Sequence, residues 1–152
     1  LLKYTRTPYA FEYLDHIASY IRGVPHIRED YLYKLSTTVE PKGVEALKHV
    51  AKVLEKEVDI NVMVEGHTDD VPMKGAGEIK DNWDLSVMRA TSVTKIILGG
   101  TTIDAKRITS AGRGEFFPLD AGKTADARKK NRRTEIILTP KLDELLKVLG
   151  SN

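Results

Sequence analysis

The chain has 152 residues, of which 41% are apolar and 30% are charged. This length fits one domain, and the apolar share is enough for a packed core, which excludes an intrinsically disordered chain. Basic residues number 24 and acidic residues 22, a formal net charge of +2, so the overall charge gives no argument for nucleic-acid binding. Because the chain has no cysteine, disulfides, thiolate metal sites and a cysteine nucleophile are excluded.

Four elements are predicted in the first part of the chain. Apolar residues at steps of three and four predict a helix over residues 8–23 and another over 44–57. A short strand is predicted over 31–35. Residues 60–66 alternate apolar and polar types, which predicts a strand with one face in the core. Its inward side chains are Ile60, Val62 and Val64.

The middle of the chain is predicted to hold one long helix and a short strand. The helix covers residues 83–98, with Asp81 or Asn82 as its N-cap. The strand covers 107–111. The loop between the strand at 60–66 and this helix carries one proline and two glycines, which is typical of irregular connections.

The last part is predicted to contain a short helix over 124–130, a strand over 134–138 and a helix over 140–149 that begins at a proline. Strands therefore alternate with helices along the whole chain. This order indicates an α/β or α+β sandwich in which helices pack on a sheet. We find no internal repeat and no transmembrane stretch of roughly 20 apolar residues.

The densest polar cluster is Gly66-His67-Thr68-Asp69-Asp70, at the end of a predicted strand. Loops at strand ends are common places for binding sites, although a turn with solvated acids explains the same residues. A metal site made of His67, Asp69 and Asp70 is disfavoured, because no other histidine stands at a ligand-like spacing.

A second cluster covers residues 82–90 and contains Arg89. Arg89 lies one turn beyond Leu85, on the stripe that also holds Val93. A guanidinium beside the core needs a partner. Two alternatives stay open on this reasoning: an internal salt bridge, for example to Asp69, or a two-pronged contact with a ligand carboxylate.

A third cluster is the basic run from Arg128 to Arg133. A solvated basic face explains it, whereas nucleic-acid binding is disfavoured because the run has no interleaved aromatic residue. An enzyme finds little support, since the sequence lacks the nucleophile elbow, the phosphate-binding loop and the zinc-protease motif.

Taken together and in order, the clusters resemble the OmpA-like peptidoglycan-binding domain family, over roughly residues 40–140 and nearest to its MotB-like branch. The motifs are Gly66-His67-Thr68-Asp69, Asn82-x-x-Leu85-Ser86-x-x-Arg89-Ala90, Gly112-x-Gly114-Glu115-x-x-Pro118 and Arg128-x-x-Asn131-Arg132-Arg133. The resemblance implies a small mixed sheet with helices packed on one face. Ala127 departs from the family, where a glycine is usual, and this departure predicts a regular helix at that turn.

The resemblance also implies a non-catalytic site for diaminopimelate, an amino acid of the peptidoglycan stem with two amino and two carboxyl groups. Asp69 would take the ammonium group and Arg89 the carboxylate at the free end of that residue. Further ligand-binding residues implied in this way are Thr68, Asn82, Leu85 and Arg128, and residues with a secondary, structural part are Asn131 and Arg132. No metal and no cofactor are expected.

The family further implies a periplasmic domain that anchors an envelope protein to the cell wall. Residues 31–152 would form this domain. Residues 1–30 have no clear counterpart in the family, and we expect them to be a helical linker or an accessory segment, with a role in self-association as a homodimer. Because the chain starts without Met or a signal peptide, a membrane anchor is expected upstream. The alternatives are a protein-interaction module of the same fold, as in Pal-like lipoproteins, and, more distantly, a wall hydrolase.

Overall fold

The computed structural model describes residue 39 and residues 41–75 and 77–141. The helix predicted over 8–23 and the strand predicted over 31–35 lie outside these residues. So does nearly all of the helix predicted over 140–149. Its first residue, Pro140, is instead the last residue of a strand, because that strand pairs with its neighbour as far as Ile60.

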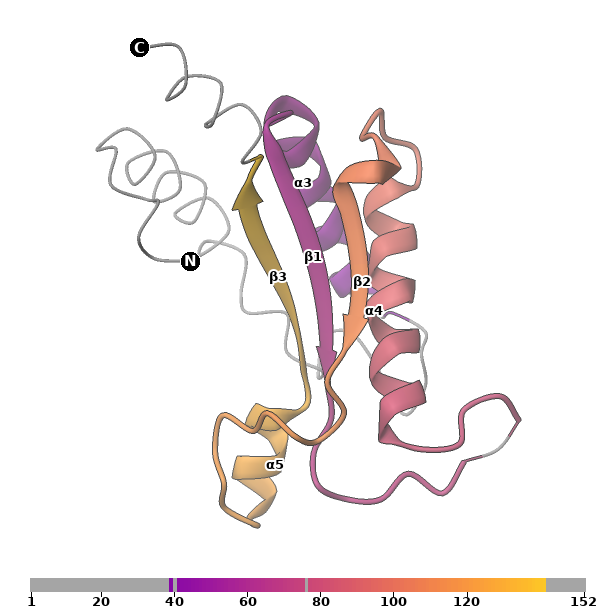
Figure 1. Ribbon diagram of the computed structural model, residues 1–152, viewed down its shortest axis with the longest axis vertical. Coiled ribbons are helices and arrows are strands. Elements are labelled where there is room, and N and C mark those ends of the chain that lie inside the picture. The colour runs from indigo at the N-terminus through magenta and orange to yellow at the C-terminus, as the bar shows by residue number, and fades with distance from the viewer. Residues whose placement is uncertain (1–38, 40, 76, 142–152) are drawn as a thin grey trace.

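Three strands form one mixed sheet in the order β2-β1-β3. The central strand, β1 (Ile60–His67), runs parallel to β2 (Ile108–Gly112) and antiparallel to β3 (Arg133–Pro140). In Figure 1 the arrowheads of β1 and β2 therefore point to one end of the sheet, and β3 starts from that end. The register pairs Gly66 with Gly112 on one side and with Thr134 on the other.

Two long helices, α3 (Pro41–Lys56) and α4 (Asn82–Leu98), cover one face of the sheet (Figure 1). The predicted spacing of apolar residues is confirmed, since both helices and β1 bury their apolar stripes in one core. The buried core residues are Val39, Leu47, Val50, Ala51, Leu54, Ile60, Val62, Val64, Ala90, Val93, Ile97 and Ile103. The sheet and helices therefore form the two-layer α/β arrangement expected from the sequence.

The start of α4 is fixed by Asp81, as one of the two predicted alternatives had it. The Asp81 side chain accepts a hydrogen bond from the backbone N–H of Asp84 at 3.0 Å, which satisfies a donor of the first helical turn. The helix ends at Gly99, whose N–H donates to the carbonyls of Lys95 and Ile96. Sequence and structure agree here because capping depends on local chemistry.

A short helical turn, η1 (Ala105–Arg107), leads into β2 and carries a buried arginine. Arg107 donates from Nε to the carbonyl of Ile60 at 2.9 Å and from Nη1 to that of Leu54 at 3.2 Å, and its Nη2 donates to the carbonyl of Glu57. Helix ends leave backbone carbonyls without partners. Arg107 therefore closes the end of α3 and fixes the turn into β1.

The short helix α5 (Ala125–Asn131) precedes β3 and begins at Thr124, whose hydroxyl accepts from the N–H of Ala127 at 3.2 Å. Ala127 lies inside α5, so the regular helix predicted at this position is confirmed. Within the part of the chain described, none of the helices has both the length and the apolar character that crossing a membrane requires.

Candidate functional site

The predicted site residues gather around one end of the sheet. This is the end where β1 and β2 finish and β3 begins, and it carries α5 and the loops that join it to the strands (Figure 1). Side chains from three separate parts of the sequence meet there, namely the loop after β1, the first half of α4, and α5 with the start of β3.

One face of α4 supplies a stripe of buried polar side chains made of Asn82, Ser86 and Arg89. These residues follow one another at steps of four and three, so they share a face of the helix. Asn82 donates from Nδ2 to the backbone carbonyls of Asp69 at 3.3 Å and Val71 at 3.1 Å. The stripe is therefore fastened directly to the loop that follows β1.

Helix α4 approaches β1 very closely at Gly66. A Cβ atom placed on Gly66 would lie 2.1 Å from the backbone oxygen of Ser86, so only glycine fits at this crossing. The Ser86 hydroxyl accepts a hydrogen bond from the N–H of Gly114 at 3.1 Å, and the N–H of Thr68 donates to the carbonyl of Gly114 at 2.9 Å. The backbone of Gly114 thus joins the loop after β2 both to α4 and to the loop after β1.

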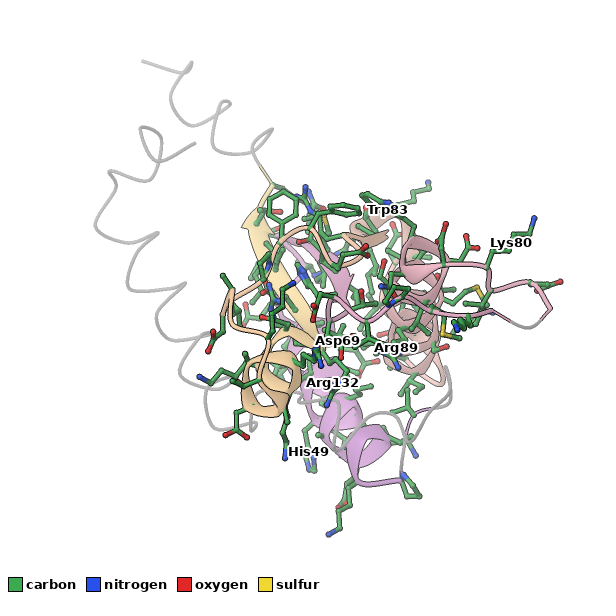
Figure 2. All side chains as sticks on the ribbon, turned by 90° about the horizontal axis from the view of Figure 1, so that it is seen from below. His49, Asp69, Lys80, Trp83, Arg89 and Arg132 are labelled. Carbon is green, nitrogen blue, oxygen red and sulfur yellow. The ribbon has the colours of Figure 1, made fainter. Side chains whose placement is uncertain are left out.

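Asp69 lies in the loop after β1, with 12% of its side chain exposed. Its Oδ1 accepts from the N–H of Val71 at 3.0 Å, and its Oδ2 accepts from Nη1 of Arg132 at 2.8 Å. Figure 2 looks onto this end of the molecule and shows Asp69 beside Arg132. The carboxylate has four lone-pair positions and uses two in these bonds, so acceptor capacity remains.

Asp70, the next residue, forms ion pairs with Nζ of Lys123 at 2.7 Å and with Nε of Arg128 at 2.9 Å. The hydrogen bond from Arg128, followed by that from Lys123, holds the pKa of the Asp70 carboxyl far below its ordinary value. In return, Asp70 raises the pKa of Arg128. The predicted ligand residue Arg128 is therefore held beside the loop after β1, although by Asp70 and not by Asp69.

Asn131, at the end of α5, organises the loop that leads into this helix. Its Oδ1 accepts from the N–H groups of Leu119 at 2.8 Å and Asp120 at 3.0 Å, and its Nδ2 donates to the Asp120 carbonyl at 2.8 Å. Leu85 and Thr68 are buried at the same end of the sheet. The structure thus places all eight predicted site residues in this region.

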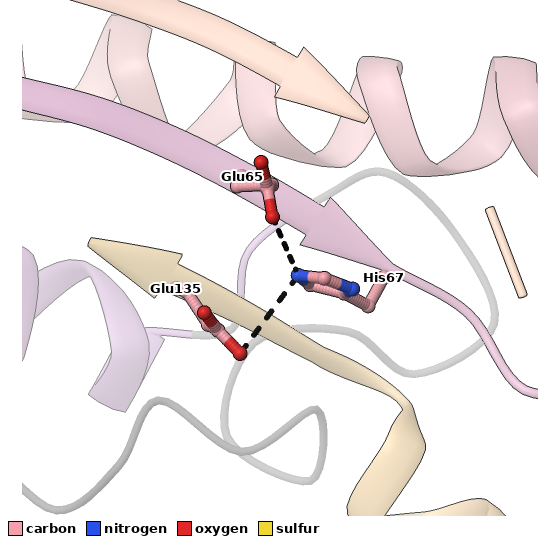
Figure 3. A group of neighbouring side chains, drawn as sticks. All are labelled: Glu65, His67 and Glu135. Carbon is pink, nitrogen blue, oxygen red and sulfur yellow. Dashed lines mark ion pairs between the residues drawn. The ribbon is translucent and has the colours of Figure 1, made fainter. Parts of the chain in front are cut away.

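A group not foreseen from the sequence lies on the sheet face opposite the helices. Strand alternation predicted that Glu65 faces outward, whereas both Glu65 and His67 are buried. Nε2 of His67 lies 3.2 Å from Oε1 of Glu65 and 3.8 Å from Oε1 of Glu135, as Figure 3 shows. Arg113 pairs with Glu65 at 2.9 Å and Arg133 with Glu135 at 2.6 Å.

This group offers three ligand atoms within 4.8 Å of one another. Both carboxylates are already neutralised by Arg113 and Arg133, whose positive charges oppose a cation. Burial is the main cause that lowers the pKa of His67, and the charge of Arg133 comes next. We therefore describe Glu65, His67 and Glu135 as part of a partly buried polar network held by Arg113 and Arg133, with His67 favoured in its neutral form.

A stack of exposed aromatic rings also escaped the sequence reasoning. The ring of Trp83, in the first turn of α4, packs on that of Phe116, in the loop after β2, with 5.3 Å between ring centroids. The available signal was weak. It consisted of a tryptophan next to Asn82 and two adjacent phenylalanines in a glycine-containing loop.

The sequence matches a known protein family. The model of the OmpA family matches residues 34–132. The chain is 36% identical over 104 residues to Motility protein B of Bacillus subtilis, covering 68% of this chain and 40% of that protein. It therefore spans less than half of that relative's length.

Solved structures give the same fold. The periplasmic domain of Helicobacter pylori MotB has a TM-score of 0.69 at 22% identity, over 81% of this chain and 79% of that one. The cell wall anchor of the T6SS from Pseudomonas aeruginosa has a TM-score of 0.63 at 35% identity, over 72% and 75%. The first of these likenesses shows the fold alone.

Proposed function

The chain belongs to the OmpA family, and on that premise we propose that it binds peptidoglycan through the diaminopimelate of the peptide stem. In this way it would anchor an envelope protein to the cell wall from the periplasm. The family match and Motility protein B confirm the resemblance that the sequence motifs indicated. The relative named as a cell wall anchor supports peptidoglycan as the partner.

The observation that carries the proposal is the contact between the loop after β1 and the polar stripe of α4. Asn82 joins the backbone of Asp69 to the helix on which Arg89 lies two turns further on. An acidic and a basic side chain are therefore held on two rigid, mutually fastened segments. Preorganised groups of this kind lose little conformational entropy when a ligand binds.

The chemistry of the ligand matches this pair of charges. The free end of diaminopimelate carries an ammonium and a carboxylate on one carbon atom. Asp69 has acceptor capacity left for the ammonium, and the planar guanidinium of Arg89 suits a carboxylate, which it can hold with two parallel hydrogen bonds. A lysine-type stem lacks this carboxylate, so it cannot form the two hydrogen bonds with the guanidinium. Its affinity for the site should therefore be lower.

Calorimetric titration tests the proposal with two free peptides, a diaminopimelate stem and its lysine counterpart. We expect the wild-type chain to prefer the diaminopimelate peptide by at least about tenfold, or about 1.4 kcal/mol. Asp69→Asn and Arg89→Lys should each weaken this binding by a similar factor, because one removes a charge and the other the two-pronged donor.

Asp59→Asn provides the matched control. Asp59 is exposed in the turn before β1, at the end of the sheet opposite the expected site, so the same change there leaves that site untouched. The control should bind like wild type. Equal affinity for both peptides, or unchanged binding by the Asp69 and Arg89 variants, would contradict the proposal and favour a protein partner for this fold.

A further inference from the structure

Large apolar side chains are exposed beside the end of the sheet that carries the proposed stem site. Trp83 is 48% exposed and Phe116 58% exposed, although their rings stack on each other at an interplanar angle of 27°. Phe117 is exposed next to them, with the guanidinium of Arg113 4.6 Å from its ring centroid. We call Trp83, Phe116 and Phe117 the aromatic platform.

The platform is built on a fixed loop. Gly114 has φ +55°, a backbone conformation that favours glycine, and it starts the turn closed by the hydrogen bond from the N–H of Phe116 to the carbonyl of Arg113. Arg113 is itself held by Glu65 at 2.9 Å. The platform therefore presents its rings in one defined arrangement, and its exposure is not that of a single stray side chain.

The same loop is continuous with the proposed stem site. Gly114 donates to Ser86 in the polar stripe of α4 and accepts from Thr68, the residue before Asp69. Trp83 directly follows Asn82, which bonds to the backbone of Asp69. The platform and the proposed stem site are therefore connected through Gly114 and through the first turn of α4.

We propose that the aromatic platform binds the sugar strand of peptidoglycan, so that the domain contacts the glycan as well as the stem. This inference rests on the proposed function, because the stem is covalently joined to that strand. One face of a pyranose ring presents C–H bonds, which suit the electron-rich face of an aromatic ring. The flanking hydroxyl groups can be met by Arg113, whose side chain is 43% exposed.

A sugar fits these features better than a protein partner. Flat, stacked rings with a polar group at the rim match an amphipathic, uncharged ring ligand. Protein interfaces of useful strength need about 800 Å² on each partner, which is much more than three side chains provide. A protein partner is therefore kept as an outcome of the experiment.

Tryptophan fluorescence gives a direct readout, because Trp83 is the single tryptophan of the chain. The probes are the free diaminopimelate stem peptide, the same peptide carrying its disaccharide, and a peptide-free glycan oligomer. We expect the disaccharide and the oligomer to change the Trp83 emission. The free peptide should leave it almost unchanged.

Calorimetry with the same probes measures the energetic share of the platform. The disaccharide-peptide should bind wild type about tenfold more tightly than the free peptide does. Trp83→Ala should abolish this gain and change the free-peptide affinity less than about twofold, whereas Trp83→Phe should keep most of the gain because a flat ring remains. Val58→Ala, at an exposed apolar residue before β1, is the control and should bind all probes like wild type.

The outcomes separate this inference from the proposed function. Glycan binding that depends on Trp83, without any binding of the free peptide, would support the platform and refute the stem site. Stem binding with no gain from the disaccharide, or a gain that survives Trp83→Ala in a variant with wild-type circular dichroism, would overturn the platform. The second result would indicate that the exposed rings bind a protein partner.

Discussion

The crossing of β1 and α4 at Gly66 provides the sharpest test of how the fold positions the site. A Cβ atom at this position would lie 2.1 Å from the Ser86 oxygen and 2.9 Å from its carbonyl carbon. Both distances are shorter than ordinary van der Waals contact, and the distance to the oxygen is more than 1 Å too short. Both atoms belong to the helix backbone, so no side-chain rotation relieves the clash. Gly66→Ala must therefore move α4 away from β1.

The expected cost follows from this geometry. Overpacking a closed interior costs typically about 1–3 kcal/mol, and a clash between two backbone segments belongs at the upper end, near about 3 kcal/mol. The displacement would also pull Asn82 and Arg89 away from the loop that holds Asp69. We expect affinity for the diaminopimelate peptide to fall at least about tenfold, in proportion to the lost contacts.

Urea unfolding followed by far-UV circular dichroism measures the loss of stability, and calorimetry measures the loss of binding. Gly100→Ala is the matched control, since Gly100 has φ +73° and no atom within 4 Å of an added Cβ. Its cost should be only the backbone strain of about 1 kcal/mol, with peptide binding unchanged. A Gly66→Ala variant no less stable than the control would refute the argument from the close crossing.

Two further predictions concern buried charged and titratable groups. Arg107→Met should destabilise the fold by about 3–5 kcal/mol in urea unfolding, because it leaves the carbonyls of Leu54 in α3 and Ile60 in β1 without their charged donor. Lys106→Ala, at the exposed neighbour, should stay within about 0.5 kcal/mol of wild type. Equal effects of the two substitutions would contradict the structural role of Arg107. The pKa of His67 is lowered in the folded state, so the unfolded chain takes up the proton first and stability should fall as pH decreases below about 6.5. Unfolding at pH 7.5 and 5.5 measures this slope, which His67→Gln should reduce, and an unchanged slope would show that other groups cause it.

Local patterns in the sequence were sufficient to predict the two long helices and β1, but not η1 or the extension of β3 to Pro140. The alternation of Ile60, Val62 and Val64 predicted the buried face of β1, and the spacing in α3 and α4 predicted their core stripes, because each depends only on the period of the backbone. The N-cap Asp81 follows from its own side-chain chemistry. The helix at Ala127 could also be predicted from the sequence, because alanine favours a regular helix and glycine does not.

The ion pairs of the site were harder to predict from the sequence because they join residues that are far apart in the chain. Asp69 and Arg132 are 63 positions apart, and Asp70 and Arg128 are 58 apart. No periodicity specifies which acid meets which base. The sequence alternatives for Asp69 included a bridge to Arg89, whereas the pair the structure forms is with Arg132.

The burial of Glu65 has a similar origin. Alternation along β1 correctly placed Glu65 on the face away from the helices. The expectation that this face is exposed to solvent was wrong for Glu65. Arg113 after β2 and Glu135 on β3 gather around His67 on the same face, and this is decided by strand order and register. The sequence did not reveal the sheet topology, and this topology decides which polar side chains meet on the sheet face away from the helices.

The central position of β1 would also have a mechanical consequence if the domain binds a fixed polymer, as we propose. Asp69 of the proposed stem site lies in the loop directly after β1. Strand β1 is paired over five residues with β2 and over eight with β3. Hydrogen bonds in the antiparallel pair run across the strand, so tension along β1 loads them in shear. Many bonds then share the load together, whereas peeling at an edge would break them one after another.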